Sequence, residues 1–193
     1  MNDNRSKLKL ILVFVLLLPL FTSCVTTPTP IEYSIENPSV IETEDVIIRF
    51  TLIPEEKSLE LFGESGNVFG PYPGLLMKKQ SYIIKMEIEA KRSPLTLDLR
   101  NIYLKVGDIS SQSRNKAQLL NDWKTFLRNT KDREHAEFLT DKYMFSNKFT
   151  VTKDQPASGL IAFLKKYPES DDISITIGIT PEGMPLQELS INL

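Results

Sequence analysis

Three segments of the chain alternate apolar and polar residues with a period of two, at 46–52, 82–90 and 173–179. Such alternation places one face of a strand in a core and the other face in water. The pattern therefore predicts a mostly β protein built from antiparallel sheets. Shorter apolar runs add five candidate strands, at 31–36, 58–62, 148–152, 160–164 and 186–193.

The segment 95–106 also alternates, but its apolar positions change phase in the middle. Leu95, Leu97 and Leu99 are odd-numbered, whereas the next apolar residues are Ile102, Leu104 and Val106. A β-bulge near Arg100 and Asn101 would bring both halves onto the same face. Eight or nine short strands separated by turn residues are typical of a two-sheet sandwich.

One region has helical rather than strand periodicity. Its apolar residues follow the spacing of an amphipathic helix, at Leu119, Leu120, Trp123, Phe126 and Leu127. Asn115 followed by Gln118 resembles a capping box at the start of this helix. Asp132 is a candidate N-cap for a second short helix. The pattern predicts a helical insertion at about 110–143, between two strands of the sandwich.

The N-terminus has the composition of an export signal. Arg5, Lys7 and Lys9 precede an unbroken apolar run at 10–18, and small residues follow at Thr22 and Ser23. The apolar run is shorter than the roughly 20 residues that a transmembrane helix needs. We therefore expect a signal segment rather than a permanent membrane span.

Cys24, the single cysteine among 193 residues, follows this signal directly. Phe21-Thr22-Ser23-Cys24 resembles the lipobox of bacterial lipoproteins, with Phe where those proteins usually carry Leu. The resemblance implies removal of the signal peptide 1–23, diacylglycerol on the Cys24 sulfur and a further acyl chain, such as palmitate, on the new amine. Two or more chains anchor a protein stably to a membrane. Val25 after the cysteine, rather than Asp, implies outer-membrane delivery in a cell that has such a membrane. The alternative is an unmodified thiol within a discarded signal.

A Thr/Pro tether at 24–30 separates the lipid site from the domain 31–193. The tether, the Gly-led apolar strand at 159–163 and the final strand pair at 173–193 resemble telokin-like, immunoglobulin-fold lipoprotein domains. That resemblance implies an immunoglobulin-like β-sandwich and a module without catalytic residues outside the cytoplasm.

Charge and cysteine content exclude several kinds of partner and site. The signal 1–23 holds three of the 23 Lys and Arg and one of the 25 Asp and Glu, so the remainder has a formal net charge of −4. A mildly acidic domain without a basic block argues against a nucleic-acid partner. A single cysteine excludes an intrachain disulfide and a cysteine-based metal site.

The search for catalytic motifs favours a protein that is not an enzyme, with no cofactor and no metal. His135 is the single histidine and lies in a charge-rich segment that is typical of a solvated helix face. The stretch 63–66 lacks the last glycine of a nucleophile elbow, because Asn67 stands in its place. The S-x-x-K match at 113–116 has no K-T-G or S-D-N partner motif.

Two features are candidates for binding a partner. The loop 68–76 carries Phe69 and Tyr72 among Gly and Pro, and the predicted helix carries Trp123. In both cases the alternative is that the apolar side chains pack on the domain itself. We therefore predict a membrane-anchored, non-catalytic binding or scaffolding module of the cell envelope whose partner is an envelope protein. The open alternatives are an envelope enzyme, or an accessory subunit of one, that uses Asp or Glu, and a surface-exposed adhesin.

Overall fold

The computed structural model describes residues 28–35, 37–73 and 79–193, and the lipidation candidate Cys24 lies outside these ranges. Strands make up 44% of the chain, together with three helices in the described part. The elements in chain order are β1 Ser39–Glu42, β2 Val46–Ile53, α2 Glu55–Phe62, β3 Gln80–Ala90, β4 Leu95–Val106, β5 Ile109–Gln112, α3 Lys116–Trp123, α4 Thr130–Tyr143, β6 Lys148–Val151, β7 Ala157–Lys165, β8 Ile173–Pro181 and β9 Gln187–Asn192.

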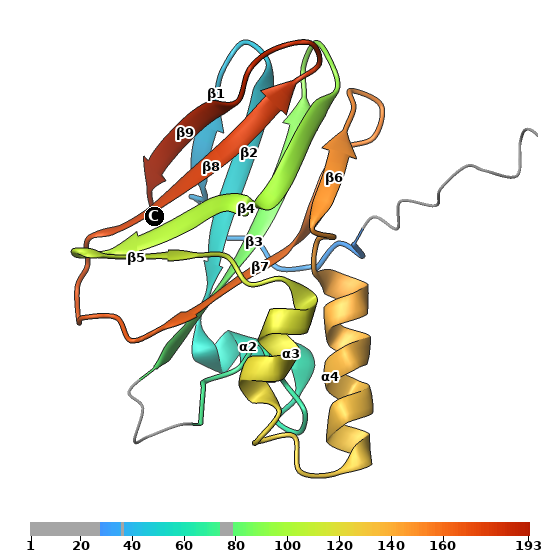
Figure 1. Cartoon of the computed structure of the whole chain (residues 1–193), viewed down its shortest axis with the longest axis vertical. Coiled ribbons are helices and arrows are strands. Elements are labelled where there is room, and N and C mark those ends of the chain that lie inside the picture. The colour runs from blue at the N-terminus through green and yellow to red at the C-terminus, as the bar shows by residue number, and fades with distance from the viewer. Residues whose placement is uncertain (1–27, 36, 74–78) are drawn as a thin grey trace, which may run out of the picture.

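The strands form two antiparallel sheets packed as a sandwich (Figure 1). One sheet has the order β1-β2-β3-β7, and the other has the order β5-β4-β8-β9 with β6 also paired to β4. The prediction of a mostly β, antiparallel two-sheet protein is confirmed. The immunoglobulin-like order is not confirmed, because an immunoglobulin domain pairs its second strand with its fifth strand, whereas here β2 pairs with β3.

The main core lies between the two sheets and contains the residues that the alternating pattern assigns to it. Ile48, Ile84 and Ile175 are each fully buried and belong to one cluster with inward-facing residues of β4 and β7. Both seams of the sandwich are bridged. Ser39 Oγ donates to Asn192 O at 3.0 Å between β1 and β9. Opposite, the Arg114 N–H donates to Ala162 O at 2.7 Å beside β5 and β7.

The bulge predicted near Arg100 and Asn101 is confirmed in β4. Leu97 faces Ile179 of β8 and Ile102 faces Ile177, so four residues of β4 oppose the single residue Gly178. The extra residues shift the phase, and the apolar side chains on both sides of the bulge are buried in the same core.

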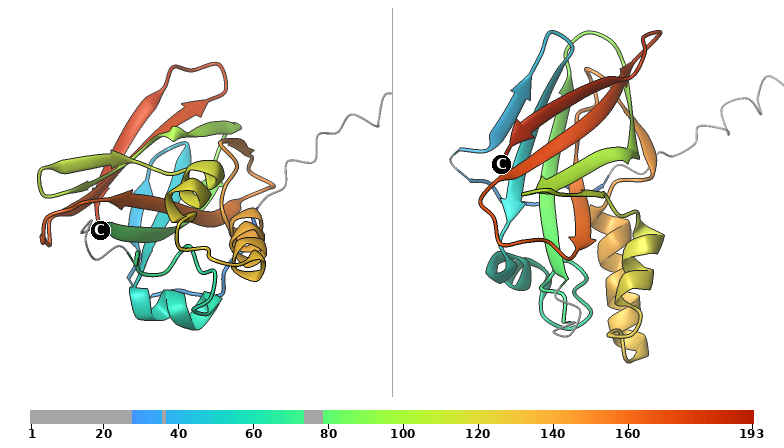
Figure 2. Two further views of the ribbon diagram at one scale, coloured as in Figure 1. Left: turned by 60° about the horizontal axis from the view of Figure 1, so that its bottom comes forward. Right: turned by 60° about the vertical axis from the view of Figure 1, so that its left-hand side comes forward.

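The three helices lie together at one end of the sandwich, as the right-hand view of Figure 2 shows. They enclose a second core against the outer face of the first sheet. This core includes Ile53 of β2, Ile83 of β3, Leu160 of β7, Leu119 of α3 and Leu139 of α4. The helices thus cover apolar residues on the outer face of this sheet, which explains why Ile53 and Ile83 depart from strict alternation.

Several strand predictions need correction. Residues 58–62 belong to the helix α2, because Pro54 at the N-cap and two acidic residues in the first turn favour a helix start. Residues 31–35 contain no strand. The insertion predicted at about 110–143 begins instead with the strand β5, and its helical part starts at Lys116.

Both helices predicted in the insertion are present, but the N-cap prediction is correct for only one of them. Asn115 caps α3 in a reciprocal capping box with Gln118, since each side chain accepts a hydrogen bond from the other residue's backbone N–H. The cap of α4 is Asn129 rather than Asp132, and its side chain accepts from the Asp132 N–H at 2.9 Å.

Candidate functional site

The chain enters the fold at Pro28, close to the lipidation candidate in sequence. Pro28 is buried, and its ring lies so close to Gly159 of β7 that an added Cβ at Gly159 would stand 2.8 Å from Pro28 Cγ. The Thr29 N–H donates to Lys142 O at the end of α4, at 2.7 Å. The start of the described chain is therefore fixed to β7 and α4.

The two candidate binding features meet in space, because Tyr72 of the predicted loop contacts Trp123 of α3. Tyr72 stacks edge-on against Trp123, with ring centroids 5.5 Å apart, and against Phe126 at 5.2 Å. The Tyr72 hydroxyl donates to Asp122 O at 3.1 Å. Burial, with a smaller effect of the Asp122 charge, raises the pKa of Tyr72 above its ordinary value. Tyr72 therefore stays a neutral hydrogen-bond donor, and it is the half-buried member of the three predicted residues.

Phe69 and Trp123 are packed inside the domain, with 2% and 6% of their surfaces exposed. Phe69 is held by a buried amide network. The Asn67 Oδ1 accepts from the Phe69 N–H at 2.9 Å, and Asn67 Nδ2 donates to Gly63 O at 2.8 Å. Phe69 O in turn accepts from Ser58 Oγ at 2.7 Å. These contacts correspond to the alternative in which the loop residues pack on the domain, and Tyr72 is the part-exposed residue of the three.

A hollow of about 260 Å3 lies beside this aromatic cluster. Trp123 and Phe126 form one wall, and the turn 63–66 forms another together with Asp132. Gly63 and Gly66 both have positive φ, at 75° and 69°, so 63–66 forms a turn, which follows the helix α2 rather than lying between two strands. Ser65 donates to an Asp132 carboxylate oxygen and so joins this turn to α4.

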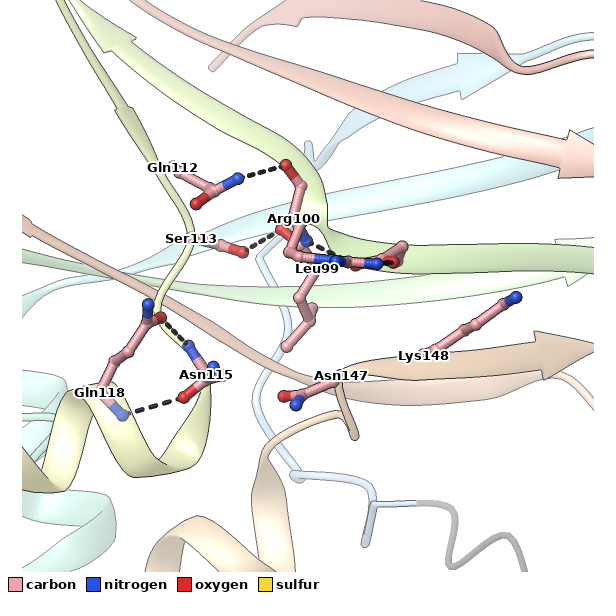
Figure 3. Close-up of a pocket in the computed structure, with 9 residues that line it drawn as sticks. Leu99, Arg100, Gln112, Ser113, Asn115, Gln118, Asn147 and Lys148 are labelled. Carbon is pink, nitrogen blue, oxygen red and sulfur yellow. Dashed lines mark hydrogen bonds and ion pairs between the residues drawn. The ribbon is translucent and has the colours of Figure 1, made fainter.

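A polar pocket of about 330 Å3 lies at the bulge of β4 (Figure 3). The Ser113 hydroxyl donates to Leu99 O at 2.6 Å, and Gln112 Nε2 donates to Arg100 O at 2.5 Å. Asn147 and Lys148 form the far wall, and the capping box of α3 lies at one end. The bulge exposes the carbonyl groups of Leu99 and Arg100, and the side chains of Ser113 and Gln112 donate hydrogen bonds to them.

The acidic residue of this pocket does not have the properties of a general acid. The hydrogen bond and charge of Arg100 hold the pKa of Asp98 below its ordinary value, and two Arg100 nitrogens lie within 3.1 Å of its carboxylate. A general acid at neutral pH needs a raised pKa. Asp98 thus supports the bulge as an ionised partner of Arg100.

A third pocket, of about 530 Å3, opens at the seam between β5 and β7. Lys79, Lys165 and Lys166 line it, and we call it the lysine pocket. Its remaining lining residues are Ser110, Ser111, Gln112, Arg114 and Leu164. These residues come from three distant parts of the sequence, so no local motif marked them.

His135 is half-buried on α4, with Nε2 3.1 Å from Phe62 O and its ring stacked on Phe138 at 6.3 Å. This contact joins α4 to the end of α2. Within the described ranges, no group of three or more His, Cys, Asp or Glu is arranged to hold a metal ion. No helix in that part of the chain is long and apolar enough to cross a membrane.

Comparison with known proteins returned no relatives: no family model matches the chain, and neither a curated protein nor a solved structure is significantly similar to it. The residues and their geometry therefore carry the functional argument.

Proposed function

We propose that the chain is a bacterial lipoprotein, anchored through lipid on Cys24, that acts as a non-catalytic binding or scaffolding module of the cell envelope. The proposal retains from the immunoglobulin-like resemblance only the architecture of two packed antiparallel sheets that present loops and pockets.

The observation that carries the anchoring proposal is the position of Cys24. It follows a basic start and a short apolar run, and it lies four residues before Pro28. Four residues of extended chain span at most about 14 Å. Because Pro28 is packed against β7, the lipid anchor would hold the domain close to the membrane, with the β6 and α4 side nearest to the bilayer.

The binding part of the proposal is supported by the Tyr72 cluster. Tyr72 is an amphipathic side chain on a Pro-rich loop, and Trp123 and Phe126 support it rigidly from behind. A fixed aromatic side chain with a neutral hydroxyl at its edge is a common contact residue in protein interfaces.

Metabolic labelling with an alkyne-tagged palmitate analogue tests the anchoring. The native chain should be labelled, shortened by its signal and partition into detergent, whereas Cys24→Ser should be unlabelled. Thr26→Ser, in the same tether, is the matched control and should behave like the native chain. A native chain without label, or with label retained in Cys24→Ser, would refute the anchoring proposal.

Crosslinking in living cells followed by mass spectrometry tests the binding role. The native chain should capture a defined envelope protein, and Tyr72→Ser should lose it. Tyr103→Ser is the matched control, because Tyr103 is 40% exposed on β4, away from the loop. Equal capture by both variants would exclude the Tyr72 surface, and no capture by the native chain would refute the scaffold role.

A further inference from the structure

The lysine pocket has a concentration of positive charge that the overall composition does not suggest. The whole chain has a formal net charge of −2, yet three lysines and one arginine line this single opening. Its described lining contains no carboxylate. The volume, about 530 Å3, falls within the range of ligand pockets, roughly 300–1,000 Å3.

The positive charge of the pocket that is not paired with a carboxylate comes from its lysines. Arg114 Nε is paired with Asp122 Oδ2 at 3.0 Å, and Arg114 Nη2 donates to Leu164 O at 3.3 Å, so the guanidinium is already engaged by the protein. Lys165 Nζ donates to Ser110 O at 2.7 Å across the seam. This bond holds the ammonium group at the pocket edge while two of its three protons remain available.

The kind of donor indicates the kind of anion. A bidentate carboxylate is best matched by the planar fork of a free arginine, whereas lysine acts as a compact point charge without a preferred plane. Several ammonium groups with the hydroxyl of Ser110 suit a tetrahedral, multiply charged anion. We propose that the lysine pocket binds phosphate groups.

The position of the pocket indicates where the phosphate comes from. Pro28 packs at Gly159 near the start of β7, and Lys165 ends the same strand six residues later. Six strand residues span about 20 Å. The pocket and the point nearest to the anchor thus lie at opposite ends of β7. The phosphate is therefore that of a soluble or polymeric ligand, and not that of headgroups in the bilayer that holds the protein. This second step rests on the proposed lipid anchor, whereas the phosphate site itself does not.

Titration calorimetry on the purified full-length chain in detergent tests the site, with sodium pyrophosphate and inorganic phosphate as probes at matched ionic strength. The native chain should bind pyrophosphate more tightly than phosphate, and Lys165→Gln/Lys166→Gln should weaken binding by at least about tenfold. Lys131→Gln/Lys153→Gln removes the same charge at exposed positions outside the pocket and should leave the affinity within about twofold.

Three results would overturn the proposal. The first is that the native chain shows no pyrophosphate binding above a chloride reference, and the second is that the two double variants weaken binding equally. The third is that Lys165→Gln/Lys166→Gln, the pocket variant, only aggregates, as expected if its lysines merely protect an edge strand.

Flotation with phosphatidylglycerol vesicles separates the two phosphate sources. Vesicle binding that the pocket variant abolishes would overturn the soluble source. Palmitate labelling does not depend on the pocket, so its failure is distinguishable from failure of the phosphate site.

Discussion

At the residue scale, Asn67 is the side chain on which the position of the loop 63–73 depends. It is 3% exposed and bonds the Phe69 N–H together with the carbonyl groups of Ser58 and Gly63. A buried backbone group that loses its partner costs about 1–3 kcal/mol. The network therefore explains how a segment with positive-φ glycines is held in one conformation.

We predict that Asn67→Ala lowers the free energy of unfolding by about 3 kcal/mol, because two buried backbone groups and the part-buried Gly63 carbonyl lose their bonds to this amide at once. Urea denaturation measures the change. Asn121→Ala, an exposed position on α3, should change the free energy of unfolding by less than about 0.5 kcal/mol. A loss at Asn67 no greater than that at Asn121 would contradict the role given to this amide.

Tyr167 supplies a pH-dependent contribution to stability. It is 6% exposed, stacks edge-on against Tyr82 at 5.1 Å and contacts the Ser111 hydroxyl. Burial raises the pKa of Tyr167 from 10.0 to about 12, and the Ser111 hydrogen bond offsets part of this shift. The neutral phenol is therefore favoured in the folded protein, whereas the unfolded chain releases this proton near pH 10.0.

It follows that the stability contributed by neutral Tyr167 is fully present below pH 10.0 and is lost as the pH rises toward about 12. Denaturation at several pH values should show that the native chain loses about 2 kcal/mol more over this window than Tyr167→Phe does. Tyr103→Phe, at an exposed position, should follow the native curve. Parallel curves for the native chain and Tyr167→Phe would show that the phenol is not shifted.

At the element scale, the bulge of β4 explains the phase change of the apolar residues in the sequence, and it also restricts which residue the neighbouring strand β8 can carry. Gly178 of β8 faces the four bulge residues 98–101, and an added Cβ would meet Asn101 Cβ at 2.9 Å and Leu186 Cδ1 at 3.0 Å. Leu186 is 47% exposed and its end can move, whereas Asn101 Cβ is fixed to the backbone. The bulge therefore requires glycine on the neighbouring strand.

We predict that Gly178→Ala destabilises the protein by about 2 kcal/mol, the usual cost of overpacking. Asn101→Gly removes the opposing Cβ, so the double variant Gly178→Ala/Asn101→Gly should lose less than the sum of the two single variants. Urea denaturation of all four proteins measures the coupling. Strict additivity would show that the two positions do not meet.

The strands and the bulge were predictable because their signal is local. Residues 46–52, 82–90 and 173–179 alternate over enough positions to define a face, and the phase change after Leu99 marks the bulge. Residues 58–62 show why the rule fails on short segments. Leu59 and Leu61 alternate like a strand, but Pro54, Glu55 and Glu56 start a helix that packs on the outer face of the sheet.

Candidate site residues were likewise predictable where the signal was local, and not where it depended on how distant segments pack. Cys24 was identifiable from adjacent residues and remains a prediction, since it lies outside the described ranges. Tyr72 and Trp123 were identifiable separately, but their contact joins residues 51 positions apart and depends on how the helical insertion packs. Lys79 and Lys165 share a pocket because β3 pairs with β7, with Gln80 opposite Lys165, and Ser110 joins them across the β5–β7 seam. Such long-range placement leaves no pattern in the sequence.

At the scale of the whole molecule, the entry of the chain into the domain decides where the proposed anchor would act. Pro28 fills the space above Gly159, and the Thr29 N–H bonds the carbonyl at the end of α4. The entering chain is therefore attached to β7 and α4 from Pro28 onward, so the proposed lipid anchor would act on the domain at a defined point of its surface.

Gly159→Ala tests this attachment, because the new Cβ would lie 2.8 Å from Pro28 Cγ and 3.0 Å from Phe145 Cε2. Phe145 is fully buried in the main core, so Pro28 is the neighbour that should yield. We expect the Thr29 amide to exchange its hydrogen at least about tenfold faster in the variant, while amides of the central strand β3 keep their protection. Ser158→Ala, the adjacent position on β7, should leave the Thr29 amide protected as in the native chain. If that amide stays equally protected in Gly159→Ala, Pro28 is not what holds the entering chain, and the point at which the proposed anchor would act must depend on other contacts.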